Sequence, residues 1–292
     1  MANPSTSSNA RILARFGQMT DHEWFDLLDK SAENKPTEGI ELPGFPPEEF
    51  QRSTIGNAGP GALIEGQRFY TLIKQYAHRL GVSLDPQETT ILDFGCGWGR
   101  MTRFFLKDVA AENLHGVDVI PFMIQTCKST IPHGNFSVVT AEPPTSFAAN
   151  SFDIIFAYSV FSHLAENVHI KWIEEFSRLL KPGGLLVVTT QPRRFLDLCE
   201  SLRGEQSGWH KCLANSFLDI NAAYADYDNG KFLYSPTGGE PPLDPSFYGE
   251  ALIPPQYVER EWTKYLRFCD FFDDVNVLFQ AVVVMQKADD YS

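Results

Sequence analysis

Between residues 89 and 190, short apolar runs alternate with longer amphipathic stretches, and this alternation constrains the fold more than any other feature of the chain. The alternating stretches have helical spacing and end at Lys181-Pro182-Gly183-Gly184. Strands that alternate with helices build a parallel sheet with helices on both faces. The sequence predicts an α/β fold with a doubly wound, mostly parallel sheet. The expected strands are 90–94, 114–119, 136–140, 152–158 and 185–190, and the expected helices are 99–109, 121–129 and 167–180.

The first 85 residues lie outside this alternation and predict a helical and loop extension. Thr20 and Glu23 have the spacing of a capping box, which marks the start of a short helix. Proline and glycine crowd residues 35–61 and predict a loop there. Apolar residues at helical spacing over 63–80 predict a second, longer helix.

Beyond residue 190 the alternation is lost. Residues 191–255 are rich in Gly, Pro, Tyr and Asp, and we expect an insertion that covers the acceptor site as a lid. Two strand-like runs, 271–279 and 281–286, predict a tight antiparallel hairpin that completes a Rossmann-like, seven-stranded sheet. The expected domains are therefore 1–85, 86–190 (the core), 191–255 and 256–292, the last of which completes the core sheet.

Charge makes one class of partner improbable. Among the 292 residues, 37 acidic and 24 basic side chains give a formal net charge of −13, which repels phosphate backbones. No run approaches the roughly 18 apolar residues of a membrane span, and the start of the chain has no apolar run typical of a signal sequence. We expect no nucleic-acid partner and no membrane association.

Cysteine usage indicates the compartment. The number of cysteines is odd, and they are irregularly spaced, so the sequence predicts neither a disulfide framework nor a zinc site. They stand at Cys96, Cys127, Cys199, Cys212 and Cys269. His210 lies near two of them, but the spacing does not favour a metal site. We expect no metal and a cytoplasmic location.

The strongest chemical signal follows the first predicted strand, in the segment Ile-Leu-Asp-Phe-Gly-Cys-Gly-Trp-Gly-Arg at 91–100. Glycines at 95, 97 and 99 let the backbone turn tightly and approach a ligand without Cβ clashes. A dinucleotide loop would place its third glycine one residue later, and a P-loop would need Gly-Lys-Ser or Gly-Lys-Thr. The remaining alternatives are a loop for another nucleotide-like cofactor and a ligand-free turn.

This segment, an acid at Asp93 followed by Gly-x-Gly-x-Gly, resembles the cofactor loop of class I S-adenosylmethionine-dependent methyltransferases, in the branch called type 11 or 12. Three later segments resemble the same family in the same order. They are 115–119, 152–159 and 180–187. The resemblance covers about 89–190 and implies the Rossmann-like methyltransferase fold, S-adenosylmethionine as methyl donor and S-adenosylhomocysteine as product.

The resemblance also implies where the cofactor is held. Backbone atoms of the loop would meet its methionyl part, which Asp93 would help to hold, and an acid at the end of the second strand would accept both ribose hydroxyls. Two apolar side chains would pack near the adenine. The residues concerned are Gly95, Cys96 and Gly97 for the methionyl part, Asp118 for the ribose, and Val119 and Met123 for the adenine.

After the third strand the family often has Asp-Ala-Glu, whereas this chain has Thr140-Ala141-Glu142. The usual acid is absent at Thr140, so the Ala141 backbone or Glu142 is expected to contact the adenine amino group instead. At the end of the fourth strand, Tyr158 and Ser159 either line the cofactor or pack in the core.

The reaction implied is an in-line displacement of the methyl group from the sulfonium to an oxygen, nitrogen or carbon atom of a natural product, sugar or other metabolite. Alignment of donor and acceptor supplies most of the acceleration, and a general base would add to it. His163, just past the fourth strand, is the candidate base, because an imidazole titrates in the useful range. A structural or helix-capping role for His163 is the alternative.

Competing functions on the same fold are weighed against this one. A nucleobase amino methyltransferase would show Asn/Asp-Pro-Pro-aromatic where this chain has Ala-Tyr-Ser-Val at 157–160, which disfavours that class. A non-catalytic S-adenosylmethionine-binding partner subunit, or transfer of another group such as aminopropyl, stays open because fold alone does not settle function. The acceptor, the methylated atom and the oligomeric state are not determined by the sequence.

Overall fold

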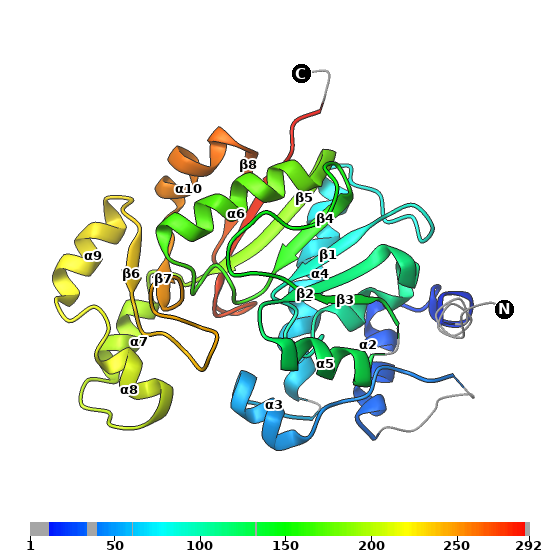
Figure 1. Ribbon diagram of the computed structural model, residues 1–292, viewed down its shortest axis with the longest axis horizontal. Helices are drawn as coiled ribbons and strands as arrows, with labels where there is room; N and C mark the ends of the chain where they lie inside the picture. Colours follow the sequence, from blue (N-terminus) through cyan, green and yellow to red (C-terminus); the bar gives the residue numbers. More distant parts are fainter. Residues whose placement is uncertain (1–11, 34–39, 60, 132, 290–292) are drawn as a thin grey trace. The chain divides into compact units, whose positions relative to one another are not determined.

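The computed structural model describes residues 12–33, 40–59, 61–131 and 133–289. Its main sheet has seven strands in the order β3-β2-β1-β4-β5-β9-β8, and a second sheet pairs β6 with β7 (Figure 1). The predicted fold class, a seven-stranded Rossmann-like sheet with an antiparallel pair at its C-terminal end, is confirmed. By its contacts the chain divides into two compact units, which are described in turn. The first runs to Val139 and includes Ser151–Phe156, and the second holds Thr140–Asn150 and the chain from Ala157 on.

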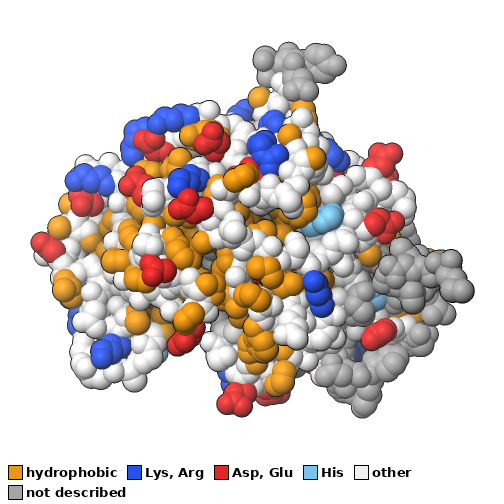
Figure 2. Space-filling view, in the orientation of Figure 1, with side chains coloured by type: hydrophobic (Ala, Val, Ile, Leu, Met, Phe, Trp, Pro, Cys, Tyr) orange, Lys and Arg blue, Asp and Glu red, His pale blue; other side chains and the backbone are white. Residues whose placement is uncertain are grey.

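The surface carries both charges. On the face shown in Figure 2, lysine and arginine side chains lie among aspartate and glutamate side chains. Within the described residues, no helix combines the length and the apolar character needed to cross a membrane.

The strands of the first unit form its centre. They are β1 (Ile91–Phe94), β2 (Leu114–Asp118), β3 (Asn135–Val138) and β4 (Phe152–Ala157). β1 pairs in parallel with β2 on one side and with β4 on the other, and β2 pairs in parallel with β3. The order of strands therefore reverses at β1, and open α/β sheets bind ligands at the carboxyl ends of the strands at such a point.

Helices of the first unit cover these strands. α4 (Gly61–Arg79) and the 3₁₀ helix η2 (Thr102–Lys107) pack over β4 through aromatic rings. Phe156 of β4 lies 6.1 Å from Phe69 and 5.2 Å from Phe105, measured between ring centroids. α5 (Pro121–Thr130) packs against β2 and β3. This unit also contains α2 (Asp21–Lys30), α3 (Glu48–Ile55) and the 3₁₀ helices η1 (Ser31–Glu33) and η3 (Ala111–Asn113).

One predicted helix of this unit is wrong in type and length. The sequence predicts a helix over 99–109, but the structure has only the 3₁₀ segment η2 there. Gly95, Gly97 and Gly99 all have positive φ, at 72°, 54° and 78°, so the backbone is still turning at Gly99. A helical backbone cannot include those angles, and regular structure therefore begins only at Thr102.

The predicted capping box at the start of α2 is confirmed. The Thr20 hydroxyl accepts a hydrogen bond from the Glu23 amide at 3.2 Å, and the Glu23 carboxylate accepts one from the Thr20 amide at 2.8 Å. These bonds satisfy two amides that the first turn of a helix otherwise leaves unpaired.

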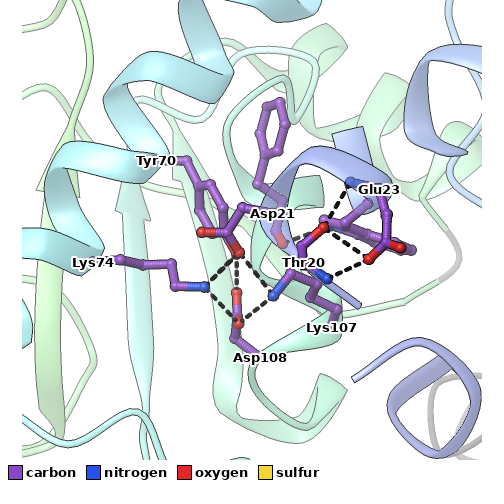
Figure 3. A network of polar contacts seen from close by, with 9 residues as sticks. Thr20, Asp21, Glu23, Tyr70, Lys74, Lys107 and Asp108 are labelled. Carbon is purple, nitrogen blue, oxygen red and sulfur yellow. Dashed lines mark hydrogen bonds and ion pairs between the residues drawn. The ribbon is translucent and has the colours of Figure 1, made fainter. Parts of the chain in front are cut away.

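A polar network fixes α2 to α4 and η2 (Figure 3). The Asp21 carboxylate of α2 pairs with Lys74 of α4 at 2.6 Å and with Lys107 of η2 at 2.9 Å. Asp108 accepts a hydrogen bond from the Tyr70 hydroxyl at 2.5 Å and pairs with the same two lysines. Burial opposes ionisation of Asp21, but the bonds from the lysines hold its pKa below its usual value. The Asp21 carboxylate thus stays charged and paired at neutral pH.

The second unit is built on antiparallel strands. α6 (Glu166–Leu179) leads into β5 (Leu180–Thr190), which pairs with β9 (Ala281–Gln286), and β9 pairs with β8 (Arg267–Phe272). The sequence places a turn at 181–184, whereas these residues belong to β5. The reason lies at the end of β9, because Gly183 and Gly184 exchange backbone hydrogen bonds with Lys287 at 3.1 and 2.9 Å.

The predicted antiparallel pair is confirmed, but its tight turn and the strand expected over 271–279 are wrong. β8 ends at Phe272, so residues 273–280 form a longer connection to β9. Leu278 and Gln280 of this connection bury their side chains at 2% and 9% exposure, and β8 carries an irregularity between Phe268 and Asp270. The apolar residues that resemble a strand in the sequence therefore pack as a loop.

Residues 191–255 contain regular structure that the sequence pattern does not reveal. The elements are α7 (Phe195–Ser201), α8 (Gly208–Ala214), α9 (Ile220–Asp228), β6 (Leu233–Ser235) and β7 (Glu250–Leu252). α7, α8, α9 and both strands bury side chains in one apolar cluster that includes Phe195, Leu213 and Tyr227. The helices are too short to show a clear hydrophobic period. The four predicted domain boundaries stay predictions.

Candidate active site

The glycine loop after β1 is held against the end of β2. The amides of Gly95 and Cys96 both donate to the Val117 carbonyl, at 2.8 and 2.9 Å. A Cβ placed on Gly97 would meet no atom within 4 Å, so the space beside this glycine is open. A ligand that contacts backbone needs such an open side, and the loop therefore fits the methionyl role predicted for Gly95, Cys96 and Gly97.

Asp118, at the end of β2, is hydrogen-bonded to this loop. One carboxylate oxygen accepts from the Gly97 amide at 2.9 Å and the other from the Ile120 amide at 2.9 Å. Burial raises the pKa of Asp118, and these backbone bonds oppose the rise. Each carboxylate oxygen has a second lone pair, so both can still accept a ribose hydroxyl. The structure thus brings together Asp118 and Gly97, and the ribose contact stays a prediction.

Asp93, in β1 just before the loop, is 1% exposed. Its carboxyl accepts a hydrogen bond from the Thr102 hydroxyl of η2 at 2.5 Å. Burial raises the pKa of Asp93 to about 7, against the opposing effect of Thr102. Thr102 is a residue that sequence reasoning missed. The expected role of Asp93 in holding the methionyl part stays a prediction.

The raised pKa of Asp93 predicts a loss of stability as the pH increases. Above its usual value of 3.8 the carboxyl ionises in the unfolded chain, whereas in the folded protein it resists ionisation up to about pH 7. The unfolded state therefore gains free energy of ionisation between about pH 4 and 7, which costs the ligand-free fold about 1–3 kcal/mol. We expect Asp93→Asn to remove this part of the pH dependence, as measured by thermal unfolding of both proteins across that range. Melting curves of protein and variant that shift in parallel with pH would contradict the assignment.

The residues predicted near the adenine lie at the start of α5. Val119 and Met123 are partly buried, and Phe122 between them is 58% exposed. The Phe122 ring contacts Phe50 of α3 edge to face, with 5.4 Å between centroids. An apolar surface thus follows Asp118, as an adenine site requires, and the contacts of Val119 and Met123 stay predictions.

Cys96 is buried in the loop beside a second thiol. Burial raises the pKa of the Cys96 thiol, with a further contribution from the neighbouring Cys127. Cys127 of α5 donates to the Gly97 carbonyl at 3.1 Å. Cys127 therefore helps to hold the loop. This contact could not be predicted from the sequence, because α5 contacts the loop only in the folded protein.

In the second unit, Ala141 and Glu142 already have partners. The Ala141 carbonyl accepts from the Trp172 indole at 3.0 Å, and the exposed Glu142 carboxylate pairs with Lys171 at 2.6 Å. The Thr140 hydroxyl donates to the Glu142 carbonyl at 2.6 Å. The adenine roles expected of Ala141 and Glu142 stay predictions.

Ser159, two residues after the end of β4, has a backbone φ of 58°, which is unusual for a residue other than glycine. Its amide donates to the Thr189 hydroxyl at 2.7 Å, and its hydroxyl accepts from the Gln280 amide at 3.0 Å. Gln280 also accepts from Thr189 at 2.5 Å. This network, which includes two residues missed in the sequence, holds the strained backbone. Tyr158 is buried beside it, and the cofactor contacts of both residues stay predictions.

His163 is partly buried, with its side chain 14% exposed. Its Nδ1 lies 2.8 Å from the Gly249 carbonyl, and its ring stacks on Tyr248 at 4.9 Å between centroids. A carbonyl oxygen only accepts, so Nδ1 must carry the hydrogen, and Nε2 of the neutral ring is then the proton acceptor. The geometry therefore suits a general base, and it also gives His163 a structural bond.

Groups of His, Cys, Asp or Glu side chains hold metal ions in proteins. Among the described residues, no group of three or more His, Cys, Asp or Glu is placed to hold a metal ion. Of the three residues considered from the sequence, Cys199 is buried, Cys212 is partly buried and His210 is exposed.

The sequence of the core matches a known family. Residues 91–184 match the family model described as a methyltransferase domain. A 2-methyl-6-phytyl-1,4-hydroquinone methyltransferase of Synechocystis sp. is 31% identical over 142 residues, which are 48% of this chain and 42% of that protein. A malonyl-[acyl-carrier protein] O-methyltransferase of Brevibacillus brevis is 31% identical over 163 residues, which are 52% of this chain and 58% of that protein. The chain thus spans about half the length of these relatives.

Solved structures share the fold. An S-adenosylmethionine-dependent methyltransferase from Clostridium acetobutylicum superposes with a TM-score of 0.53 at 14% identity, over 82% of this chain and 97% of that chain. At this identity the likeness concerns the fold alone, and it agrees with the observed strand order. Residues 91–184 thus match a methyltransferase domain, and the glycine loop and Asp118 both lie within the matched segment.

Proposed function

We propose that this protein transfers a methyl group from S-adenosylmethionine to a small or mid-sized acceptor molecule. The observation that carries the proposal is the open space beside Gly97, which lies next to a carboxylate fixed by the loop itself. The methyltransferase names of the relatives support the same reaction.

The chain's own residues have separate roles in this proposal. When bound, S-adenosylmethionine supplies a methyl group that is already activated by a sulfonium. The loop at 95–97 holds the methionyl part, Asp118 accepts the ribose hydroxyls, and Val119 and Met123 pack against the adenine. His163 accepts a proton from the acceptor, which would add about 10²–10⁴-fold to the rate.

The class of methyl acceptor is inferred from the similarity to named relatives. The names of the relatives refer to a hydroquinone and to a malonyl group on a carrier protein. We infer that this chain methylates a metabolite in a biosynthetic reaction. A cytoplasmic location agrees with its odd number of irregularly spaced cysteines.

Two measurements test the proposal. Calorimetry with S-adenosylmethionine and S-adenosylhomocysteine should show binding of both to the full chain. Incubation with labelled S-adenosylmethionine and a metabolite extract should then yield labelled small molecules. Binding without any transfer would favour the second candidate, a non-catalytic partner subunit, and the absence of binding would refute both.

We also propose that the segment around α8 acts as a lid. Trp209 of α8 is 51% exposed, and its indole donates to the buried Glu250 carboxylate at 2.8 Å. Gly204 and Gly208 precede it with φ of 97° and 56°, and a Cβ on either would meet no atom within 4 Å. The open surroundings of these two glycines leave the backbone room to move, and the Trp209 contact together with Leu213 of α8 in the apolar cluster would hold the closed position.

For this lid we expect slower proteolysis when ligands are bound. Cleavage within 203–208 should slow several-fold in the presence of S-adenosylhomocysteine and an extract fraction that supports methyl transfer, because a closed lid opens less often. Mass spectrometry of the fragments measures the rate, and cleavage near the exposed Gln87 is the internal control. Equal cleavage at 203–208 with and without ligands would count against a lid.

A further inference from the structure

A buried carboxylate lies beside the candidate base. Glu250 of β7 is 2% exposed, and its Oε2 lies 3.7 Å from Nδ1 of His163. Its other oxygen accepts from the Trp209 indole at 2.8 Å. Oε2 itself has no hydrogen-bond partner among the described residues, and the Gln191 side chain also interacts with this carboxyl group. A buried carboxylate is costly to keep, so its position next to an imidazole requires an explanation.

The backbone fixes this arrangement. The segments 162–165 and 247–251 run side by side, and the Gly249 amide donates to the His163 carbonyl at 2.8 Å. The Ala251 amide donates to the Ser162 carbonyl at 2.8 Å. A Cβ on Gly249 would lie 2.1 Å from the Ser235 carbonyl of β6, so only glycine allows this close approach. The backbone hydrogen bonds between these two segments therefore hold His163 and Glu250 close to each other.

Two titratable side chains lie against the His163 ring, and both come from the facing segment. The Tyr248 ring stacks on the imidazole with 16° between planes, and the Glu250 carboxyl lies beside Nδ1. Burial raises the pKa of Glu250, while the charge of His163 and the Trp209 indole oppose the rise. When His163 takes up a proton, the carboxylate faces a full positive charge at short range, and the interaction is strong where water is excluded.

We propose that Glu250 is a positioning residue that makes His163 a proton acceptor, and that the methylated group is therefore a hydroxyl of an alcohol or phenol. The inference rests on the proposed methyl transfer. A lone pair of the acceptor oxygen forms the bond to the methyl carbon, and the electron pair of the broken carbon–sulfur bond returns to sulfur. The oxygen keeps the electrons of its O–H bond, and the proton passes to Nε2 of His163. A carboxylate acceptor is already ionised near neutral pH and would need no such pair.

The first test needs no acceptor. Diethyl pyrocarbonate modifies the unprotonated imidazole nitrogen, so the modification of His163 in the full chain, followed by mass spectrometry, should increase with pH. Without the carboxylate the imidazolium is less stable, and in Glu250→Gln we expect modification about 3- to 10-fold faster below pH 6. At pH 8, well above the ordinary pKa of an imidazole, the rates should agree. Glu174→Gln, on the exposed face of α6, is the matched control and should behave as the unchanged protein.

Either of two results in this test would overturn the role of Glu250. One is the same pH dependence in Glu250→Gln and in the unchanged protein. The other is a faster reaction at every pH, which would mean that the substitution only exposes His163. Binding of S-adenosylmethionine to the variant, measured by calorimetry, shows separately whether the variant is folded.

The second test identifies the product class. Labelled products formed from ¹³C-methyl S-adenosylmethionine and a metabolite extract are examined by NMR before and after mild alkali. A methyl ether keeps its label in alkali and supports the proposal. A methyl ester, which releases labelled methanol, or an N- or C-methyl product, would overturn the hydroxyl assignment. A complete lack of labelled product refutes the proposed function instead, and the modification experiment then decides on Glu250 by itself.

Discussion

Replacing His163 with alanine is expected to slow methyl transfer by about 10²–10⁴-fold and to leave the affinity for S-adenosylmethionine nearly unchanged. The bond from Nδ1 to the Gly249 carbonyl leaves Nε2 as the proton acceptor of the neutral ring. Without Nε2, the molecule that receives the methyl group must lose its proton to water. Turnover with the acceptor found in the metabolite screen, together with calorimetry of donor binding, measures both effects.

A second variant separates catalysis from structure. In His163→Asn the side-chain amide can still donate to the Gly249 carbonyl, but the position of Nε2 is empty. We expect this variant to melt close to the unchanged protein and to be as slow as His163→Ala. His78→Ala, on the exposed last turn of α4, is the control for loss of an imidazole and should keep full turnover. Near-normal turnover in His163→Asn would leave His163 with a structural role only.

Asp118→Ala is expected to weaken S-adenosylmethionine binding by about 10- to 100-fold, the effect of losing charge-assisted hydrogen bonds worth about 1.5–3 kcal/mol. Its two oxygens accept hydrogen bonds from the amides of Gly97 and Ile120, and each keeps a second lone pair for the predicted contact with a ribose hydroxyl. Calorimetric titration of protein and variant with the donor measures the loss.

The control for this substitution is Asp26→Ala, which removes a carboxylate at an exposed position of α2. It should bind the donor as the unchanged protein does. Asp118→Asn adds a finer comparison, because an amide keeps the size of the carboxyl group but loses its charge and one of its two acceptor atoms. Unchanged affinity in Asp118→Ala would refute the assignment of the ribose site.

The class of fold and the position of the cofactor loop could be predicted from local sequence patterns. Strand β1 is a short buried run next to glycines, and β2 ends in Asp118, so both are encoded by neighbouring residues. Because β1 and β2 are parallel neighbours, their carboxyl ends meet, and the contact between Gly97 and Asp118 follows from local pattern and topology.

The limits of regular structure were decided by tertiary contacts. The segment around Gly183 has the composition of a turn, yet it is strand because the end of β9 pairs with it. Residues 99–109 have helical composition, but positive φ at Gly99 delays regular structure until Thr102. Local propensity is weak compared with backbone hydrogen bonds made to a distant strand, so such boundaries are not encoded nearby in the chain.

The surroundings of the candidate base depended on tertiary structure most of all. His163 and Gly249 are 86 residues apart, and nothing near position 250 marks its glutamate as more than one acid among many. Gln280 and Ser159, which form a hydrogen bond, are 121 residues apart in the sequence. Cys127 and Gly97, which also form one, are 30 residues apart. A local pattern reports burial and periodicity, whereas the pairing of a carboxylate with an imidazole depends on which distant segments lie side by side. Only the fold, through the close approach of Gly249 to β6, brings Glu250 and His163 together.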